Sequence, residues 1–286
     1  MIGARGQVGS EVVRAATADG HQALQLNRED CDVTSAGQVR RALEACAPLD
    51  VVVNTAAYHR VDECESHPDR AVGVNARGAH HVTIAARAVG ARTVYISTDY
   101  VFDGRAKQPY VETDAVAPLN VYGASKAAGE AITCFVSPQG CVARIAAVFG
   151  PAGSSAKGGN FVERMVATAR AGQAPRVIDD IVMSPTSAAD AAALLVKLLA
   201  GSAEPGVYHL ANSGQCSWRE FADAIFELCD LPVRAEPIRA AESQGPARPA
   251  YSALSSAALA TYGLAARPWK EALADYLTSR GYRSQS

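Results

Sequence analysis

Apolar residues occur in short runs over the first half of the chain, and stretches with helical periodicity separate these runs. The runs 49–54, 93–96 and 141–146 are nearly continuous, as strands buried on both faces of a sheet must be, and 23–26 is expected to form another short strand. Helical patterns follow the first glycines to about residue 19 and cover about 35–46, 77–89 and the stretch from 122. This alternation predicts an α/β fold with a doubly wound parallel sheet.

Beyond residue 150 the pattern changes. A loop is expected over 153–159, helices over about 160–171, 188–199, 218–229 and 269–280, and a strand over 207–210. We therefore expect a dinucleotide-binding domain over 1–150 and a second domain mainly over 151–286, with segments near 172–200 returning to the first.

Composition narrows the possible partners. The 286 residues carry a net charge of −2 with no basic cluster, which gives no reason to expect nucleic acid or an anionic membrane as partner. No apolar run approaches the ~20 residues of a membrane span, and the N-terminus lacks the regions of a signal peptide. The seven cysteines are scattered without a Cys-x-x-Cys motif and the histidines show no ligand spacing, so we expect a cytoplasmic protein with reduced thiols and no metal site.

The glycines at positions 3, 6 and 9 form a Gly-x-x-Gly-x-x-Gly turn directly before a helical pattern. Such a turn lets backbone amides at a helix N-terminus approach a pyrophosphate. A strand should precede it, but only Met1 and Ile2 do. Either this strand is very short, or the recorded start lies a few codons late; a flexible start without a ligand is the remaining alternative.

Residues after the next two strands favour NADPH as the cofactor, with NADH as an alternative. An acidic residue at the end of the second strand would bind a ribose 2′-hydroxyl, whereas Asn27 and Arg28 suit a 2′-phosphate. Asp32 either faces the adenine or caps the following helix. The small Ala56 and Ala57 allow close approach of the nicotinamide ribose.

Tyr122 and Lys126 are four residues apart, so they share one helix face. A nearby ammonium is expected to lower the pKa of Tyr122, so that this side chain could exchange a proton with a carbonyl oxygen. Thr98 follows the run 93–96 and so lies at the carboxyl end of a strand, where open parallel sheets bind ligands. The long polar segment between Asp103 and Asn120 is expected to form an active-site flap.

These motifs occur in an ordered set of blocks along the whole chain, which include 54–58, 97–104, 122–130, 184–186, 207–210 and 248–254. The set resembles the dTDP-4-dehydrorhamnose reductase family, a sugar-nucleotide reductase branch of the extended short-chain dehydrogenases. The resemblance implies a Rossmann domain with a smaller, discontinuous α+β domain for a nucleotide-diphospho sugar. It also implies that Thr98, Tyr122 and Lys126 are catalytic and that Asp99 and Tyr100 line the sugar side.

Arg248 and Ser252 are expected to bind the phosphates of the nucleotide, with a surface ion pair as the alternative for Arg248. The residues expected to bind the cofactor are Gly3, Gly6, Gln7, Val8, Arg28, Asp32, Val33, Ala56, Ala57, Tyr58, Asn75, Tyr122 and Lys126. The chain departs from the family at Ala147, where an aromatic sugar contact is common, and at His59 and Ile181. These departures concern which sugar is bound rather than the chemistry.

The expected activity is NAD(P)H-dependent reduction of a nucleotide-activated 4-keto-6-deoxy sugar. Two alternatives remain open at this stage: an NAD-dependent nucleotide-sugar epimerase or dehydratase with the same three catalytic residues, and a non-catalytic NADP-binding regulatory subunit. A homodimer is also compatible with the sequence.

Overall fold

The computed structural model describes residues 1–152, 159–201 and 203–283, so the loop expected over 153–159 lies almost entirely outside the described residues. The helices within the described part are α1 (Gln7–Ala18), α2 (Ala36–Cys46), α3 (Val61–Ser66), α4 (Pro68–Val72), α5 (Gly78–Ala88), α6 (Val121–Val136), α7 (Phe161–Arg170), α8 (Ala188–Ala200), α9 (Trp218–Leu228) and α10 (Trp269–Ser279). The strands are β1 (Val51–Asn54), β2 (Arg92–Thr98), β3 (Cys141–Ile145), β4 (Val148–Phe149), β5 (Arg176–Ile178), β6 (Val182–Met183), β7 (Thr186–Ser187), β8 (Gly206–His209), β9 (Cys216–Ser217) and β10 (Glu236–Ile238).

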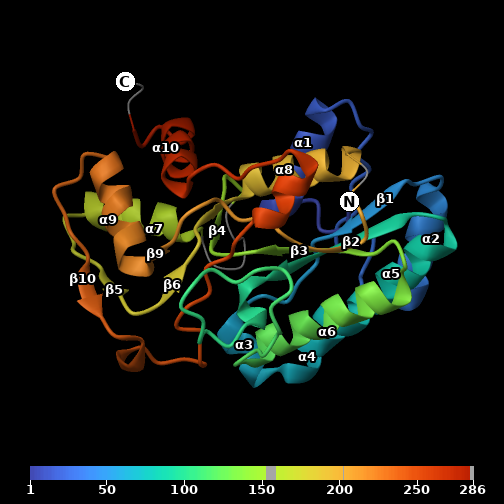
Figure 1. Ribbon diagram of the computed structural model, residues 1–286, viewed down its shortest axis with the longest axis horizontal. Helices are drawn as coiled ribbons and strands as arrows, with labels where there is room; N and C mark the ends of the chain where they lie inside the picture. Colours follow the sequence, from blue (N-terminus) through green and yellow to red (C-terminus); the bar gives the residue numbers. More distant parts are fainter. Residues whose placement is uncertain (153–158, 202, 284–286) are drawn as a thin grey trace.

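A parallel sheet with the order β1-β2-β3-β8 forms the centre of the larger part of the molecule (Figure 1). In its register, Val53 lies opposite Val94 and Ser97 opposite Arg144. Parallel strands need crossover connections, and helices on both faces of the sheet provide them. The α/β fold expected from the alternating pattern is therefore confirmed.

The strand expected over 23–26 is reduced to one residue. Leu26 forms an isolated parallel bridge with Ile2, which forms a second bridge with Asn54 on its other side. Ile2 thus continues the sheet beyond β1. Met1 donates to the Leu24 carbonyl at 2.7 Å and Leu26 donates to the Met1 carbonyl at 2.8 Å, so the segment lies beside Met1 and Ile2, but no strand forms over 23–25.

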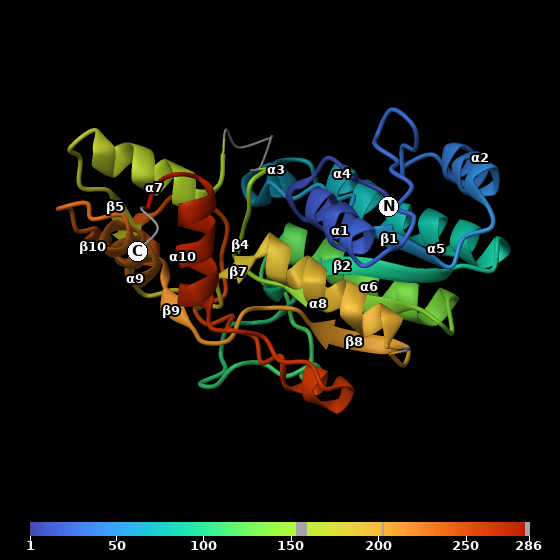
Figure 2. The ribbon, with the colours of Figure 1, turned by 90° about the horizontal axis from the view of Figure 1, so that it is seen from above.

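Helices cover both faces of the sheet, with α1 and α8 on one side and α5 and α6 on the other (Figure 1). In the view from above, α1 and α8 lie in front of the strands (Figure 2). On one face, α1 packs against α8, and both bury apolar side chains against the strands. On the other face, α5 packs against α2 and α6. Because β8 pairs with β3 and α8 contacts α1, chain from beyond residue 187 completes the larger part.

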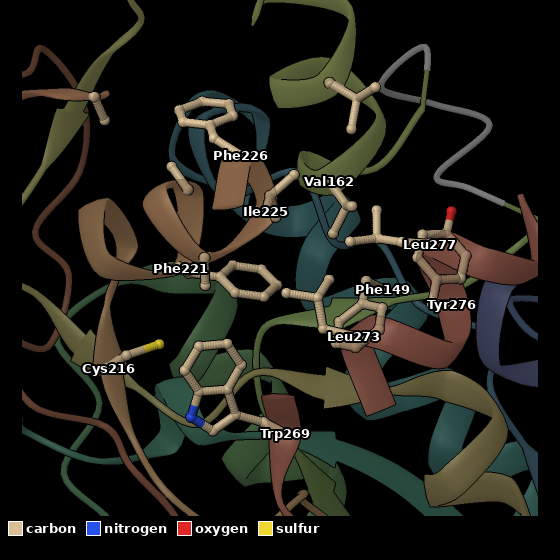
Figure 3. Close-up of a cluster of buried hydrophobic side chains, with 14 of the residues drawn as sticks. Phe149, Val162, Cys216, Phe221, Ile225, Phe226, Trp269, Leu273, Tyr276 and Leu277 are labelled. Carbon is tan, nitrogen blue, oxygen red and sulfur yellow. The ribbon is translucent and has the colours of Figure 1, made fainter. Parts of the chain in front are cut away.

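A second apolar core lies in the smaller part of the molecule (Figure 3). Phe149, Phe221 and Trp269 meet there with ring centroids 5.8 Å and 5.6 Å apart in successive pairs. Helices α7, α9 and α10 supply most of the other buried side chains. This core is separate from the cores that pack against the sheet, so each part of the molecule has a core of its own.

The segment 103–120 does not form a flap over the active site. Tyr110 donates its backbone N–H to Ala253, and Ser255 donates to Tyr110, so the segment is tied to the chain near residue 254. The Tyr110 ring also stacks on Phe102, with centroids 4.0 Å apart. The flap expectation is wrong because these bonds and the stacked ring hold the segment away from the cleft, whose lining it does not join.

In the part of the chain that the structure describes, no helix is both long enough and apolar enough to span a bilayer.

Two glycines let α6 approach the strand ends closely. A Cβ at Gly123 would lie 2.1 Å from the carbonyl oxygen of Tyr100, and one at Gly129 would lie 2.4 Å from the Tyr95 hydroxyl. Both distances are far shorter than a tolerable contact, so any larger residue would move the helix. The absence of side chains at these positions therefore sets the distance between α6 and β2.

We expect Gly129→Ala to lower the free energy of unfolding by about 1–3 kcal/mol, the usual cost of overpacking a core. Gly37→Ala on α2 is the matched control, because the nearest atom to its added Cβ is the end of the flexible Arg41 side chain at 3.4 Å. This control should be neutral or gain up to about 1 kcal/mol from the better helix propensity of alanine. Urea denaturation of both variants measures the difference; equal stabilities would contradict the packing argument.

Candidate active site

One cleft of about 1490 Å³ runs along the carboxyl ends of the parallel strands and continues between the two parts of the molecule. Its walls include the glycine turn, the end of β2 and the start of α6 on the side of the sheet. Residues from α7, β5 and the segment near 248–252 line the opposite side. Ligands bind at this edge in open α/β sheets, because the loops that follow the strands gather there.

The glycine turn forms the inner end of the cleft. Gly3 has a φ of +77°, which favours glycine, and a Cβ at Gly9 would lie 2.2 Å from the Gly3 carbonyl oxygen. Helix α1 begins at Gln7 without a side-chain cap, so its first amides are available to an anion. Gln7 donates from Nε2 to the Val148 carbonyl at 2.8 Å, while its buried Oε1 has no partner among the described residues.

Charged residues form the rim of the cleft near the end of the glycine turn. Arg28 lies 3.6 Å from Asp32, and Arg5 lies 3.2 Å from Glu29. Hydrogen bonds from Thr34, followed by the nearby Arg28 charge, lower the pKa of Asp32. The first residue of α2 is capped by Ser35 rather than by Asp32. Asp32 therefore does not cap α2, which leaves the alternative that it faces the adenine of a cofactor.

The loop after β1 lines the middle of the cleft with Ala56, Ala57 and Tyr58. Asn75 lies behind this loop in a turn of π-helix and is completely buried. Its side chain accepts from the backbone N–H of Tyr58 at 2.8 Å and donates to Ser125 at 2.9 Å. Asn75 therefore joins the Tyr58 loop to α6 and does not line the cleft; its predicted contact with a cofactor stays a prediction.

Thr98 and Tyr122 meet where β2 ends and α6 begins. Asn120 caps α6, and Glu65 accepts the backbone N–H of Val121 at 2.7 Å, which fixes the first turn of this helix. Burial raises the pKa of Tyr122 well above its ordinary value, and a hydrogen bond with the Thr98 side chain opposes that rise. The expectation that Lys126 lowers this pKa is wrong for the structure, because burial outweighs any such effect.

Lys126 lies one turn further along α6 and is buried. Its Nζ donates to the Ile96 carbonyl at 2.6 Å and sits 3.9 Å from the centroid of the Tyr95 ring. Burial lowers the pKa of Lys126 to about 7, although the negative charge of Glu130 opposes the change. This lysine is thus held at a fixed point beside Tyr122, with its titration moved into the neutral range.

Asp99 joins the end of β2 to the segment near residue 252. Ser252 donates to Asp99 Oδ2 at 2.6 Å, and Thr98 donates to Asp99 Oδ1 at 3.0 Å. Burial raises the pKa of Asp99 to about 6, and these two hydrogen bonds oppose the rise. Because the carboxylate of Asp99 engages the Ser252 hydroxyl, the expected phosphate contact of Ser252 has no support here.

Tyr100 and Arg248 also line the cleft, as the sequence predicted. Phe161, Arg164 and Trp218 line the cleft from the smaller part. The sequence carries no signal for Phe161 and Arg164, and it indicates Trp218 only as an anchor of the core or of the interface between the domains. The Phe161 and Trp218 rings lie 4.9 Å apart and offer an apolar surface. The helical pattern predicted α7 and α9, but it gave no signal for which of their faces would meet the sheet.

This combination of a doubly wound sheet, a glycine turn at a helix N-terminus and a Thr/Tyr/Lys set at the strand ends defines an extended short-chain dehydrogenase.

Comparison with known proteins narrows this class to one family. The model of the RmlD substrate binding domain family matches residues 1–281, so the chain belongs to this family. The spore coat polysaccharide biosynthesis protein SpsK of Bacillus subtilis is 39% identical over 98% of this chain and 96% of its own length. A dTDP-4-dehydrorhamnose reductase of Mycolicibacterium smegmatis is 39% identical over 96% of this chain and 83% of its own length.

Solved structures agree with the sequence relatives. A dTDP-4-dehydrorhamnose reductase from Clostridium acetobutylicum superposes with a TM-score of 0.91 at 34% identity, over 98% of both chains. A dTDP-4-dehydrorhamnose reductase from Bacillus anthracis in complex with NADP gives a TM-score of 0.91 at 34% identity, over 97% of both chains. The family resemblance drawn from the sequence is confirmed.

The buried lysine leads to a prediction about stability and pH. Lys126 releases its proton near pH 7 in the folded protein, whereas an unfolded lysine keeps it to about pH 10.4. Between these values the unfolded state binds more protons, so the contribution of Lys126 makes the free energy of unfolding rise with pH. We expect Lys126→Met to remove this contribution.

Chemical denaturation of the parent and of Lys126→Met at intervals from pH 7 to pH 10 measures the effect. Lys107→Met, which replaces an exposed lysine, is the control and should keep the pH dependence of the parent. Parallel stability curves for the parent and Lys126→Met would show that the lysine is charged in the fold.

Proposed function

We propose that this protein uses NADPH to reduce the keto group of a nucleotide-activated 4-keto-6-deoxy sugar, as its dTDP-4-dehydrorhamnose reductase relatives are named for doing. The main support is the position of Thr98, Tyr122 and Lys126 at the strand ends, in a cleft that joins the glycine turn to Arg248. One wall of this cleft fits a dinucleotide and the other fits a second, anionic ligand.

The glycine turn fits a nicotinamide dinucleotide on geometric grounds. The first amides of α1 face the cleft without a capping side chain, and the unpartnered Oε1 of Gln7 lies at the same place. Gly3, Gly6, Gln7 and Val8 would hold the pyrophosphate, while Asp32 and Val33 would lie near the adenine. Ala56, Ala57, Tyr58 and Lys126 would surround the nicotinamide ribose.

When bound, the nicotinamide supplies hydride to the keto carbon. Tyr122 is the general acid in this proposal and gives its phenolic proton to the keto oxygen. The neutral phenol that burial maintains is the form this role requires. Thr98 orients the same oxygen by a hydrogen bond, and Lys126 fixes the ribose. Holding reactants in register in this way can supply a large share of the rate enhancement.

The substrate would lie between the strand ends and the smaller part. Arg248 and Arg164 reach the cleft and carry the charge that a diphosphate needs, while Phe161 and Trp218 offer a surface for a flat base. Ala147 also lines the cleft, where many family members have an aromatic residue. We infer that the sugar end of this cleft is roomier than in those members.

Conversion of a panel of nucleotide sugars tests the proposal as a whole. NADPH oxidation in the presence of a dTDP-4-keto-6-deoxy sugar, and none with the matching 4-hydroxy sugar, is the expected result. Interconversion of two sugars without net consumption of NADPH would indicate an epimerase instead.

We also infer a cytoplasmic location, while the homodimer stays a prediction. The seven cysteine side chains form no disulfide in the described part of the chain, as expected for a reducing compartment. Light scattering of the purified protein would measure its oligomeric state.

Tyr122→Phe removes the general acid but keeps the ring. We expect the turnover number to fall by on the order of 10²–10⁴-fold, which is typical for such a loss, with the Kd for NADPH within a few-fold of the parent. Steady-state kinetics and fluorescence titration with NADPH measure the two quantities. Turnover within a few-fold of the parent would show that another group donates the proton.

Arg28→Ala tests the preference for NADPH. Loss of a charge-assisted contact to the 2′-phosphate should weaken NADPH binding by about 10–100-fold and leave NADH binding nearly unchanged. Arg40→Ala removes a comparable exposed ion pair on α2, outside the cleft, and should change neither. If the parent already prefers NADH in kcat/KM, the argument from Asn27 and Arg28 is wrong.

A further inference from the structure

The buried carboxyl of Asp99 ends a hydrogen-bonded chain that starts at Tyr122. Tyr122 bonds to the Thr98 hydroxyl, Thr98 bonds to Asp99 Oδ1 at 3.0 Å, and Ser252 bonds to Asp99 Oδ2 at 2.6 Å. Thr98, Asp99 and Ser252 are all at least nine-tenths buried. The chain therefore connects Tyr122, the proposed general acid, to a buried carboxyl group that has no part in the reduction steps proposed above.

The Thr98 hydroxyl has only one hydrogen to donate, and more than one acceptor lies near it. When Asp99 is ionised, this hydrogen is donated to the carboxylate, and the Thr98 oxygen accepts from its other neighbours, among them the backbone N–H of Tyr100 at 3.3 Å. Thr98 then has no hydrogen to offer to a substrate carbonyl. When Asp99 is protonated, the carboxyl can donate to Thr98, and the Thr98 hydrogen becomes available to the cleft.

We propose that Asp99 is a positioning residue. Its protonation reverses the direction of the hydrogen bond between Thr98 and Asp99, so that the Thr98 hydroxyl can donate to the keto oxygen of the substrate. The inference rests on the proposed reduction and adds to it a group that acts through Thr98 without touching the reacting atoms. The Ser252 hydroxyl donates to the Asp99 carboxylate. This bond stabilises ionised Asp99, the state in which Thr98 has no hydrogen for the substrate. The segment that carries Arg248 and Ser252 therefore influences the equilibrium between protonated and ionised Asp99.

Groups on several elements face this carboxyl and act on its neighbours. Tyr100 lies on the same turn and Tyr122 on α6; Arg248 and Asp62 act electrostatically on Tyr100, and Cys64 acts on Tyr122. No carboxylate-to-cation ion pair involves Asp99 among the described residues, so burial dominates its titration. Its pKa of about 6 places the change close to neutral pH.

The proposal predicts the shape of the pH profile. The turnover number for reduction should fall as pH rises through the pKa of the carboxyl, because ionised Asp99 takes the Thr98 hydrogen. Ser252→Ala removes a hydrogen bond that stabilises the carboxylate, so the pKa should rise and the falling limb should move to higher pH by about one unit.

Asp99→Asn is the central variant, since its amide can donate permanently to Thr98 while its oxygen still accepts from Ser252. We expect the falling limb to disappear, with KM within a few-fold of the parent and, above pH 8, a turnover number at least equal to that of the parent. Thr98→Ser should keep the fall in turnover number with rising pH that the parent shows. Thr98→Val should lose this fall together with most of the activity.

Asp103→Asn is the matched control. Asp103 lies four residues away and accepts from Tyr110, but it does not line the cleft, so its loss should leave the limb unchanged. A limb that persists in Asp99→Asn, or a rise in KM with unchanged pH dependence, would overturn the proposal and make Asp99 a plain substrate contact.

A titration that needs no turnover separates this inference from the proposed reaction. Infrared or carbon-13 spectra of protein with labelled aspartate should show one carboxyl that titrates near pH 6, is absent in Asp99→Asn and moves upward in Ser252→Ala. A carboxyl that stays ionised down to pH 4 would overturn the proposed role of Asp99 even in a protein that reduces the sugar. Normal titration with no reduction of any nucleotide sugar would instead count against the proposed reaction alone.

Discussion

The ion pair between Glu130 and Arg144 holds helix α6 in its place. Arg144 donates from both Nε and an Nη to the two carboxylate oxygens at 2.9 Å and 2.7 Å, and both side chains are buried. A buried charge without its partner typically costs about 3–5 kcal/mol, so neither residue can be lost alone without severe destabilisation. Glu130 follows Lys126 by one turn on α6, and Arg144 lies opposite Ser97 in the sheet. The pair therefore sets α6 against β2 beside Thr98.

Further contacts extend this constraint towards the C-terminal segment. His209 Nε2 lies 3.4 Å from Arg144, and His209 Nδ1 lies 3.0 Å from the Ser255 carbonyl oxygen. Burial, together with the Arg144 charge, lowers the pKa of His209 to about 3, so the ring is neutral and adds no second buried charge. The chain that supplies Ser252 to Asp99 is thus anchored to the same ion pair that orients Tyr122 and Lys126.

The sequence was most informative where a local rule determines geometry. The spacing of Tyr122 and Lys126, the glycine turn and the strands at 49–54, 93–96 and 141–146 each depend on neighbours within a few residues, and their positions agree with expectation. The bonds that bury the Asn75 side chain could not be predicted, because its partners, the Tyr58 loop and Ser125, come together only in the fold. The expected lowering of the Tyr122 pKa was wrong for a related reason. Burial raises this pKa, and burial depends on the packing of the whole cleft rather than on one neighbouring lysine.

The positions of the segment 103–120 and of the α7 residues in the cleft could not be predicted either, because they depend on contacts with residues far away in the sequence. A polar segment with two prolines is compatible with a mobile cover or with a packed connection, and the Tyr110 pairing near residue 254 decides between them. Likewise, the helical pattern of α7 marks an apolar face but does not say that Arg164 faces a cleft built by distant strands. Tertiary packing carries that information.

Neither part of the molecule is one uninterrupted piece of chain. The polypeptide leaves the central sheet after β3, returns as α8 and β8, and leaves again for α9 (Figure 1). It then comes back so that Leu259 packs among the sheet residues before α10 forms. A fragment cut near residue 150 would lack the strand that pairs with β3 and the helix that covers α1. Synthesis on the ribosome therefore cannot complete the part built on the sheet before most of the smaller part has been made, and the two must mature together.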